Sequence, residues 1–183
     1  MGASICLFAR NEEKLKAVLQ ELDNSQGQKH DFILADFSKP NEVKEAIGAY
    51  VSASNPIHIL INNTGGPPGG LTIDADIEEF RIAFNNHLIN NHQLVQACVP
   101  GMKASGYGRV INVISTSVKA PLKGLGVSNT VRGAVANWSK SLANELGEFQ
   151  ITVNNVLPGA TNTVRLESII ANKAQKILRT VAT

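Results

Sequence analysis

The sequence is poor in cysteine, in aromatic residues and in net charge, and it has no long apolar run. Its 183 residues include two cysteines, one tryptophan and a net charge of only +2. Two cysteines do not form a disulfide framework, which favours a reducing compartment and therefore a cytoplasmic protein. So small a charge indicates neither a nucleic-acid partner nor an anionic membrane surface. No apolar run approaches the ~20 residues of a membrane helix, so no membrane span is predicted. His30, His58 and His92 show no metal-ligand spacing, and no metal site is predicted.

Short apolar runs alternate with amphipathic segments along the whole chain. In the first amphipathic segment, Leu15, Leu19 and Leu22 recur at spacings of four and three, which is one face of a helix. Asn11 precedes this segment and is a suitable N-cap. Strands that are apolar on both faces and alternate with helices indicate a parallel sheet with helices on both sides. We therefore predict a single α/β domain over residues 1–183, a doubly wound parallel sheet of three layers.

The predicted strands are Ser4–Ala9, Asp31–Asp36, His58–Asn62, Gly108–Ser115 and Ile151–Leu157. The predicted helices are Asn11–Asp23, Asn41–Ser52, Ile77–Lys103 with a break at Pro100-Gly101, Gly126–Leu146, and a last helix from about Thr163.

Chemically useful side chains follow the predicted strands, where open parallel sheets bind their ligands. They are Arg10, Asp36, the Asn62–Gly66 turn, Ser115 and the Pro158–Thr163 turn. Asn and Gly after a buried strand let the backbone approach a bound ribose or nicotinamide closely. The same residues are also common in ordinary turns.

Taken in order, these segments resemble the short-chain dehydrogenase/reductase family. Members carry an Asn-Asn-Ala-Gly turn, a Ser at a strand end, a Tyr-x-x-x-Lys helix and a Pro-Gly-x-x-x-Thr turn. This chain has Asn62-Asn63-Thr64-Gly65, then Ser115, then Ser128 and Arg132 four residues apart, then Pro158-Gly159-Ala160-Thr161-Asn162-Thr163. The resemblance implies a Rossmann-type fold and an NAD(P)-dependent oxidoreductase that reduces a small-molecule carbonyl. Reduction of a 3-oxoacyl carrier-protein substrate is one such activity.

The resemblance also assigns cofactor residues. Asn62, Thr64 and Gly65 would line the adenosine side with Asp36 near the adenine, and the Pro158 turn would contact the nicotinamide. Ala9 stands where NAD-preferring relatives tend to have an acid, and Arg10 follows it, which favours the 2′-phosphate of NADP over NAD. The alternative for Arg10 is a surface side chain at a strand end. The implied cofactor residues are Arg10, Asp36, Asn62, Thr64, Gly65, Arg132, Pro158, Gly159 and Thr163.

Three of the four expected catalytic positions depart from the family pattern. Ser115 is kept and would hydrogen-bond the carbonyl, but Ser128 replaces the Tyr, Arg132 replaces the Lys, and His87 replaces a helix Asn. A serine hydroxyl is a far weaker acid than a phenol, and a guanidinium with a pKa above about 12 does not pass on a proton. His87 would supply the missing acid, because an imidazole titrates near ~6.5. The alternative is a histidine packed inside the helix.

Two functions stay open on this evidence. One is a divergent oxidoreductase using Ser115, Ser128, Arg132 and His87 around NADP(H); the other is a nucleotide-binding homologue with little turnover that acts as a sensor or partner subunit. A serine hydrolase is disfavoured because no Gly-x-Ser-x-Gly turn surrounds Ser115.

The resemblance implies two further expectations. Family members begin with a strand and a Thr-Gly-x-x-x-Gly-x-Gly turn that cradles the pyrophosphate. Ser4–Ala9 matches the second strand of the family, so we expect a sheet without the first strand and without the C-terminal edge strand. The edges of Ser4–Ala9 and His58–Asn62 would then face an unfilled position, with weak NADP(H) binding. We also expect a homo-oligomer through the long helix and the helix of Ser128, at positions such as Leu94, Ala97, Ala134, Ala136 and Ala143.

Overall fold

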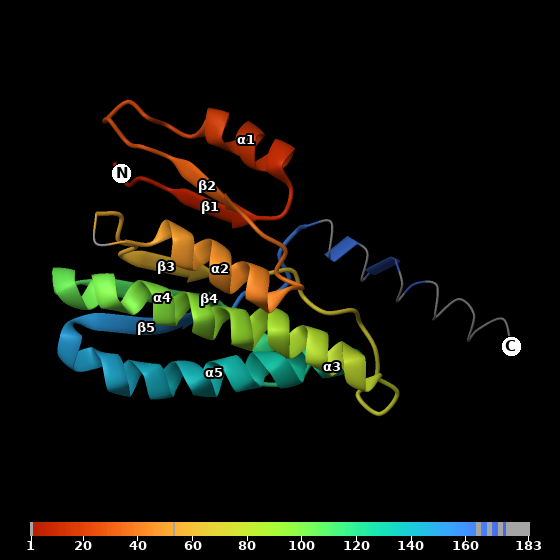
Figure 1. Cartoon of the computed structure of the whole chain (residues 1–183). Helices are drawn as coiled ribbons and strands as arrows, with labels where there is room; N and C mark the ends of the chain where they lie inside the picture. Colours follow the sequence, from red (N-terminus) through yellow and green to blue (C-terminus); the bar gives the residue numbers. More distant parts are fainter. Residues whose placement is uncertain (1, 53, 164–165, 168–169, 172–173, 175–183) are drawn as a thin grey trace, which may run out of the picture.

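The computed structural model describes residues 2–52, 54–163, 166–167, 170–171 and 174. Strands and helices alternate along this part of the chain (Figure 1). The strands are β1 (Cys6–Ala9), β2 (Asp31–Leu34), β3 (Ile59–Asn62), β4 (Gly108–Val113) and β5 (Ile151–Val156). The helices are α1 (Glu12–Glu21), α2 (Pro40–Tyr50), α3 (Ile77–Phe84), the π-helical turn η1 (Asn85–Ile89), α4 (Asn90–Ser105), the short turn η2 (Thr116–Val118), α5 (Gly126–Leu146) and the short turn η3 (Gly147–Phe149).

All pairings between the strands are parallel. β1 pairs with β2, and β3, β4 and β5 form a second sheet in that order. One hydrophobic core joins the two sheets, because Ile33 of β2 forms a buried cluster with Val43 and Ile47 of α2, and Leu60 of β3 packs against that cluster. In Figure 1, α2 and α4 lie side by side over the strands. The predicted parallel α/β fold is confirmed, and within the described residues β1 and β3 each have a strand partner on one edge only.

The strand β3 differs from its prediction in burial. Leu60 packs into the core, but Ile59 is 48% exposed and Ile61 is 61% exposed. Successive side chains of a strand point to opposite faces, so both isoleucines lie on the face away from α2 and α4. The expectation that every strand is buried on both faces is therefore wrong for β3. Leu60 lies on the side that α2 and α4 cover, and the exposure of Ile59 and Ile61 shows that the opposite face of β3 is left largely uncovered.

Most helix ends follow the sequence signals. Asn11 caps α1 by accepting a hydrogen bond from the Lys14 backbone N–H at 2.9 Å, and Pro40 occupies the first turn of α2. The helix α5 has the predicted bounds. The last helix, predicted from about Thr163, lies largely outside the described residues.

The predicted break at Pro100-Gly101 is wrong, because α4 continues through both residues to Ser105. Cys98 and Met102, on either side of the pair, are fully buried, and that packing outweighs the hydrogen bond that Pro100 does not donate. The irregularity lies instead at the π-helical turn η1. Leu94, expected at an oligomer contact, is part of the core between α2 and α4.

None of the helices in the described part of the chain has the length and hydropathy that a membrane-spanning helix requires. Within the same residues, no three His, Cys, Asp or Glu side chains are grouped to hold a metal ion.

Candidate active site

A cavity of about 340 Å³ opens at the carboxyl ends of β1, β2 and β3. Four of its lining residues were predicted to bind the cofactor: Arg10, Asp36, Thr64 and Gly65. Asn63, part of the predicted Asn62–Gly66 turn, and Ala9, which precedes Arg10, also line it. Sequence reasoning missed the other lining residues, which are neighbours of predicted ones in the chain or belong to η1. They are Phe8, Ala35, Phe37, Ser38 and Asn86.

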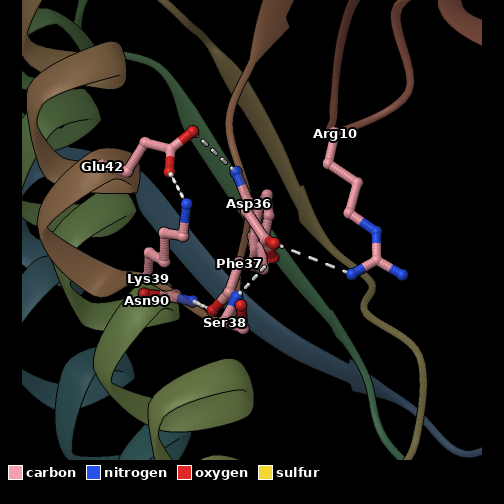
Figure 2. A network of polar contacts seen from close by, with 7 residues as sticks. All are labelled: Arg10, Asp36, Phe37, Ser38, Lys39, Glu42 and Asn90. Atoms are coloured by element: carbon pink, nitrogen blue, oxygen red, sulfur yellow. Dashed lines mark hydrogen bonds and ion pairs between the residues drawn. The ribbon is translucent and has the colours of Figure 1, made fainter.

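The Asp36 carboxylate is fixed at the rim of this cavity (Figure 2). Its Oδ1 accepts a hydrogen bond from the Ser38 backbone N–H at 2.9 Å, and its own backbone N–H donates to Glu42 Oε1 at 3.2 Å. The pKa of Asp36 lies below its usual range, mainly because of the Ser38 N–H, with a smaller effect of the Arg10 charge. Asp36 is therefore a preorganised hydrogen-bond acceptor beside the cavity.

Arg10 extends from the end of β1 toward Asp36, and its Nη1 lies 3.7 Å from Asp36 Oδ2 (Figure 2). The Arg10 side chain is 74% exposed, so its guanidinium is open to a ligand entering from solvent. A guanidinium carries five N–H donors in a fixed fork that matches a phosphate. The geometry places one cation and one anion side by side at the adenosine end predicted for the cofactor.

The loop after β2 is hydrogen-bonded to the first residue of α4. The Asn90 side chain, fully buried at the start of α4, donates to the Phe37 carbonyl at 2.7 Å. Lys39 pairs with Glu42 at 3.5 Å on the outer side of the same loop (Figure 2). The Asn90 hydrogen bond holds Phe37 in the wall of the cavity.

Asn62 does not line the cavity. It is buried at the end of β3 and donates from Nδ2 to Asn112 Oδ1 of β4 at 2.8 Å. Asn112 Nδ2 in turn donates to Ser139 Oγ of α5 at 2.9 Å and approaches Asn155 Oδ1 of β5 at 3.3 Å. This buried polar chain joins three strands to α5 and fixes the end of β3, while the following Asn63, Thr64 and Gly65 face the cavity.

His87 lies within η1 and is 2% exposed. Its Nδ1 is 2.6 Å from Thr64 Oγ1, which also lies 3.4 Å from the Asn86 carbonyl oxygen. His87 thus contacts the loop that lines the cavity, although it is not itself a lining residue.

The remaining predicted residues gather at the ends of β4 and β5. Ser115 Oγ accepts from the Ser117 N–H at 3.1 Å, which leaves the hydroxyl proton of Ser115 for an acceptor. The Thr116 N–H donates to the Pro158 carbonyl at 3.2 Å and joins the turns after the two strands. On α5, Arg132 Nη1 donates to the Val113 carbonyl at 2.8 Å, at the last residue of β4.

Ser128 precedes Arg132 by one helical turn and is 8% exposed. Gly159 follows Pro158 in an exposed turn. Thr163 Oγ1 donates to the Thr161 carbonyl at 3.3 Å and accepts from the Leu166 N–H at 3.4 Å, as a helix-capping side chain does.

Comparison with known proteins agrees with this arrangement. The profile of the short chain dehydrogenase family matches residues 1–174. A putative ketoacyl reductase of Streptomyces coelicolor is 29% identical over 170 residues, and a 3-oxoacyl-[acyl-carrier-protein] reductase of Chlamydia trachomatis is 26% identical over 180 residues. The crystal structure of L-sorbose reductase from Gluconobacter frateurii, complexed with NADPH and L-sorbose, superposes with a TM-score of 0.79 at 28% identity and covers 86% of this chain.

The chain belongs to the short-chain dehydrogenase family. It spans 65% of the Streptomyces relative, with 92% of its own residues aligned, and 73% of the Chlamydia relative, with 98% aligned. It covers 60% of the L-sorbose reductase chain.

Proposed function

We propose that this chain is an NADP(H)-dependent oxidoreductase that interconverts a small-molecule carbonyl and its alcohol. The observation that carries the proposal is the cavity at the strand ends, with the Arg10 guanidinium at its rim and Ala9 in place of an acid. An Arg that follows Ala9, rather than an acid, at the end of this strand suits a 2′-phosphate. L-sorbose reductase, which is 28% identical, binds NADPH, and this supports the choice of cofactor.

The described residues fit a dinucleotide laid along the strand ends. Its adenosine side would be held by Arg10, Asp36, Thr64 and Gly65. Asn62 would not contact the cofactor, but its hydrogen bond to Asn112 would fix the loop that does. At the other end, Pro158, Gly159 and Thr163 would contact the nicotinamide. When bound, the nicotinamide supplies or accepts the hydride.

Ser115 and the two α5 residues are proposed to surround the carbonyl. The Ser115 hydroxyl would donate a hydrogen bond to the carbonyl oxygen, because it already accepts one from the Ser117 N–H. Arg132 is held on the Val113 carbonyl and would supply positive charge and bind ribose hydroxyls, without releasing a proton. The Ser128 hydroxyl would donate a second hydrogen bond to the carbonyl oxygen. His87 as the proton source stays a prediction.

The substrate class is proposed from the relatives. One is named a putative ketoacyl reductase, a second a 3-oxoacyl-[acyl-carrier-protein] reductase and a third an L-sorbose reductase. A 3-oxoacyl thioester and a sugar ketone are therefore the first substrates to assay. Two cysteines without a disulfide support a cytoplasmic location.

We also propose a homo-oligomer that forms through α3, η1 and α5. Ile77, Ile82 and Ile89 are exposed on α3 and η1, and Ile77 and Ile89 line an apolar groove of about 440 Å³ together with Phe80 and Phe84. A set of exposed isoleucines on one helical segment is a common feature of subunit contacts. Light scattering that gives a sharp monomer mass for folded protein would contradict this proposal.

The function is tested by two measurements on the same preparation. Quenching or enhancement of NADPH fluorescence reports binding, and loss of absorbance at 340 nm with a panel of ketones and aldehydes reports turnover. We expect both, and we expect Ser115→Ala to lower kcat by about 100-fold. Thr116→Ala, an exposed neighbour, is the matched control and should retain activity. Binding without turnover on the whole panel would instead support the nucleotide-binding homologue, and no binding would refute the proposal.

A further inference from the structure

Two departures from the family pattern meet in space. Thr64 stands where the resemblance expects Ala in the Asn-Asn-Ala-Gly turn, and His87 stands where it expects a helix Asn. The two residues lie 23 positions apart, yet Thr64 Oγ1 and His87 Nδ1 are 2.6 Å apart. Thr64 brings a hydroxyl that alanine lacks, and the ring nitrogen of His87 is its partner.

The π-helical turn explains why the imidazole reaches the loop. In η1 the Asn90 N–H bonds to the Asn85 carbonyl, five residues back, so the turn holds one residue more than an α-helical turn. The extra residue rotates the following side chains relative to α3. His87 is nearly fully buried there, so its ring is held by packing and is preorganised toward Thr64.

The hydrogen bonds can run in one consistent direction. The Thr64 hydroxyl has a single proton, and the Asn86 carbonyl, 3.4 Å away, can only accept it. A proton on His87 Nδ1 would then be donated to Thr64 Oγ1, and the Thr64 proton would go to Asn86. The loop after β3 and the turn η1 are joined by both bonds.

The contact between Thr64 and His87 lies at the wall of the strand-end cavity. Thr64, from the loop after β3, and Asn86, from η1, both line that cavity. We propose that His87 is a positioning residue that acts through Thr64 and fixes these two cavity walls relative to each other. The proposal rests on the proposed function for the identity of the ligand, NADPH, and on the geometry alone for the coupling between the two residues.

The test removes each partner of the contact in turn. Thr64→Ala and His87→Leu are made singly and together, and the NADPH dissociation constant is measured by fluorescence titration. Each single change should weaken NADPH binding about five- to tenfold, the loss of one buried hydrogen bond. The double variant should bind NADPH no more weakly than either single variant, because each single change already breaks the same contact. KM for NADPH should rise in the single variants more than kcat falls. Effects that multiply in the double variant would overturn the proposal.

Two controls separate positioning from general damage. Thr64→Ser keeps the hydroxyl and should bind NADPH as the unmodified protein does. His92→Leu replaces an exposed histidine of α4 in the same way and should leave binding unchanged. If His87→Leu does not fold, Thr64→Ala against Thr64→Ser still decides, because equal affinity of these two variants would refute a role for the hydroxyl.

A readout without NADPH separates this proposal from the proposed function. Hydrogen exchange of the Asn90 amide, which donates to the Asn85 carbonyl in η1, should become about tenfold faster in Thr64→Ala and in His87→Leu, and stay slow in Thr64→Ser. If the unmodified protein binds no NADPH but shows this pattern, the function is wrong and the positioning contact stands. Unchanged exchange in both single variants would overturn the contact itself.

Discussion

Asn112→Ala removes the centre of the buried polar chain that joins β3, β4, β5 and α5. Asn112 is fully buried and accepts from Asn62 Nδ2 at 2.8 Å while donating to Ser139 Oγ at 2.9 Å. After the change Asn62 Nδ2 loses its acceptor, which costs about 1–3 kcal/mol for a buried donor. Ser139 keeps two other partners, the Val135 carbonyl at 2.7 Å and Asn155 Oδ1 at 2.8 Å.

The space left by the amide adds to this loss, and we expect about 3 kcal/mol in the free energy of unfolding. For a domain of this size that corresponds to a Tm lower by about 6–12 °C. Urea denaturation followed by the fluorescence of Trp138 measures the free energy, and a thermal scan measures Tm. We also expect weaker NADPH binding, because Asn62 fixes the strand end before the cavity loop.

Asn154→Ala is the matched control on β5. Asn154 is exposed and donates to Thr152 Oγ1 at 3.2 Å, so its replacement should change the free energy of unfolding by less than about 0.5 kcal/mol. A loss below about 1 kcal/mol in Asn112→Ala, or an equal loss in both variants, would refute the reasoning that the buried chain stabilises the sheet.

Two further perturbations follow from packing and burial. Gly126→Ala should lower the free energy of unfolding by about 3 kcal/mol, because a Cβ there would lie 2.7 Å from Thr72 backbone atoms. Gly133→Ala, on the open face of the same helix, should raise it by up to about 1 kcal/mol. Equal Tm values for the two variants would contradict this reasoning. Burial raises the pKa of both Cys98 and Tyr50 to about 12, so their neutral forms favour the folded state. Stability should be full below pH ~9 and fall as pH rises toward 12, with a shallower fall in Cys98→Ala; a flat Tm between pH 8 and 11 would contradict it.

Regular elements could be predicted where local signals agree. The bounds of α5 follow from Gly126 at its start and the apolar spacing that ends at Leu146, and Asn11 signals the start of α1. Pro100 was misleading, because the burial of Cys98 and Met102 in one core outweighs the local preference of proline. A tertiary contact of this kind has no local signature.

The sequence could predict that the site residues follow the strands, but not which way their side chains point or what they contact. Asn62 and Asn63 are identical residue types, and only the alternation of side chains along β3 sends one into the sheet and the other to the cavity. Asn86 and His87 depend on the π-helical turn, whose hydrogen bond five residues back has no recognisable sequence signal. The contact between Thr64 and His87 could therefore be found only in the structure.

The central claim is that the strand-end cavity binds NADP through Arg10. Its direct test is the ratio of NADH to NADPH dissociation constants in the unmodified protein, in Arg10→Ala and in Lys39→Ala. Lys39 carries the same charge on the outer side of the adjacent loop, where it pairs with Glu42. We expect NADPH to bind about tenfold or more tightly than NADH, Arg10→Ala to remove most of that preference, and Lys39→Ala to keep it. Equal affinity for both nucleotides, or an unchanged preference in Arg10→Ala, would contradict the account.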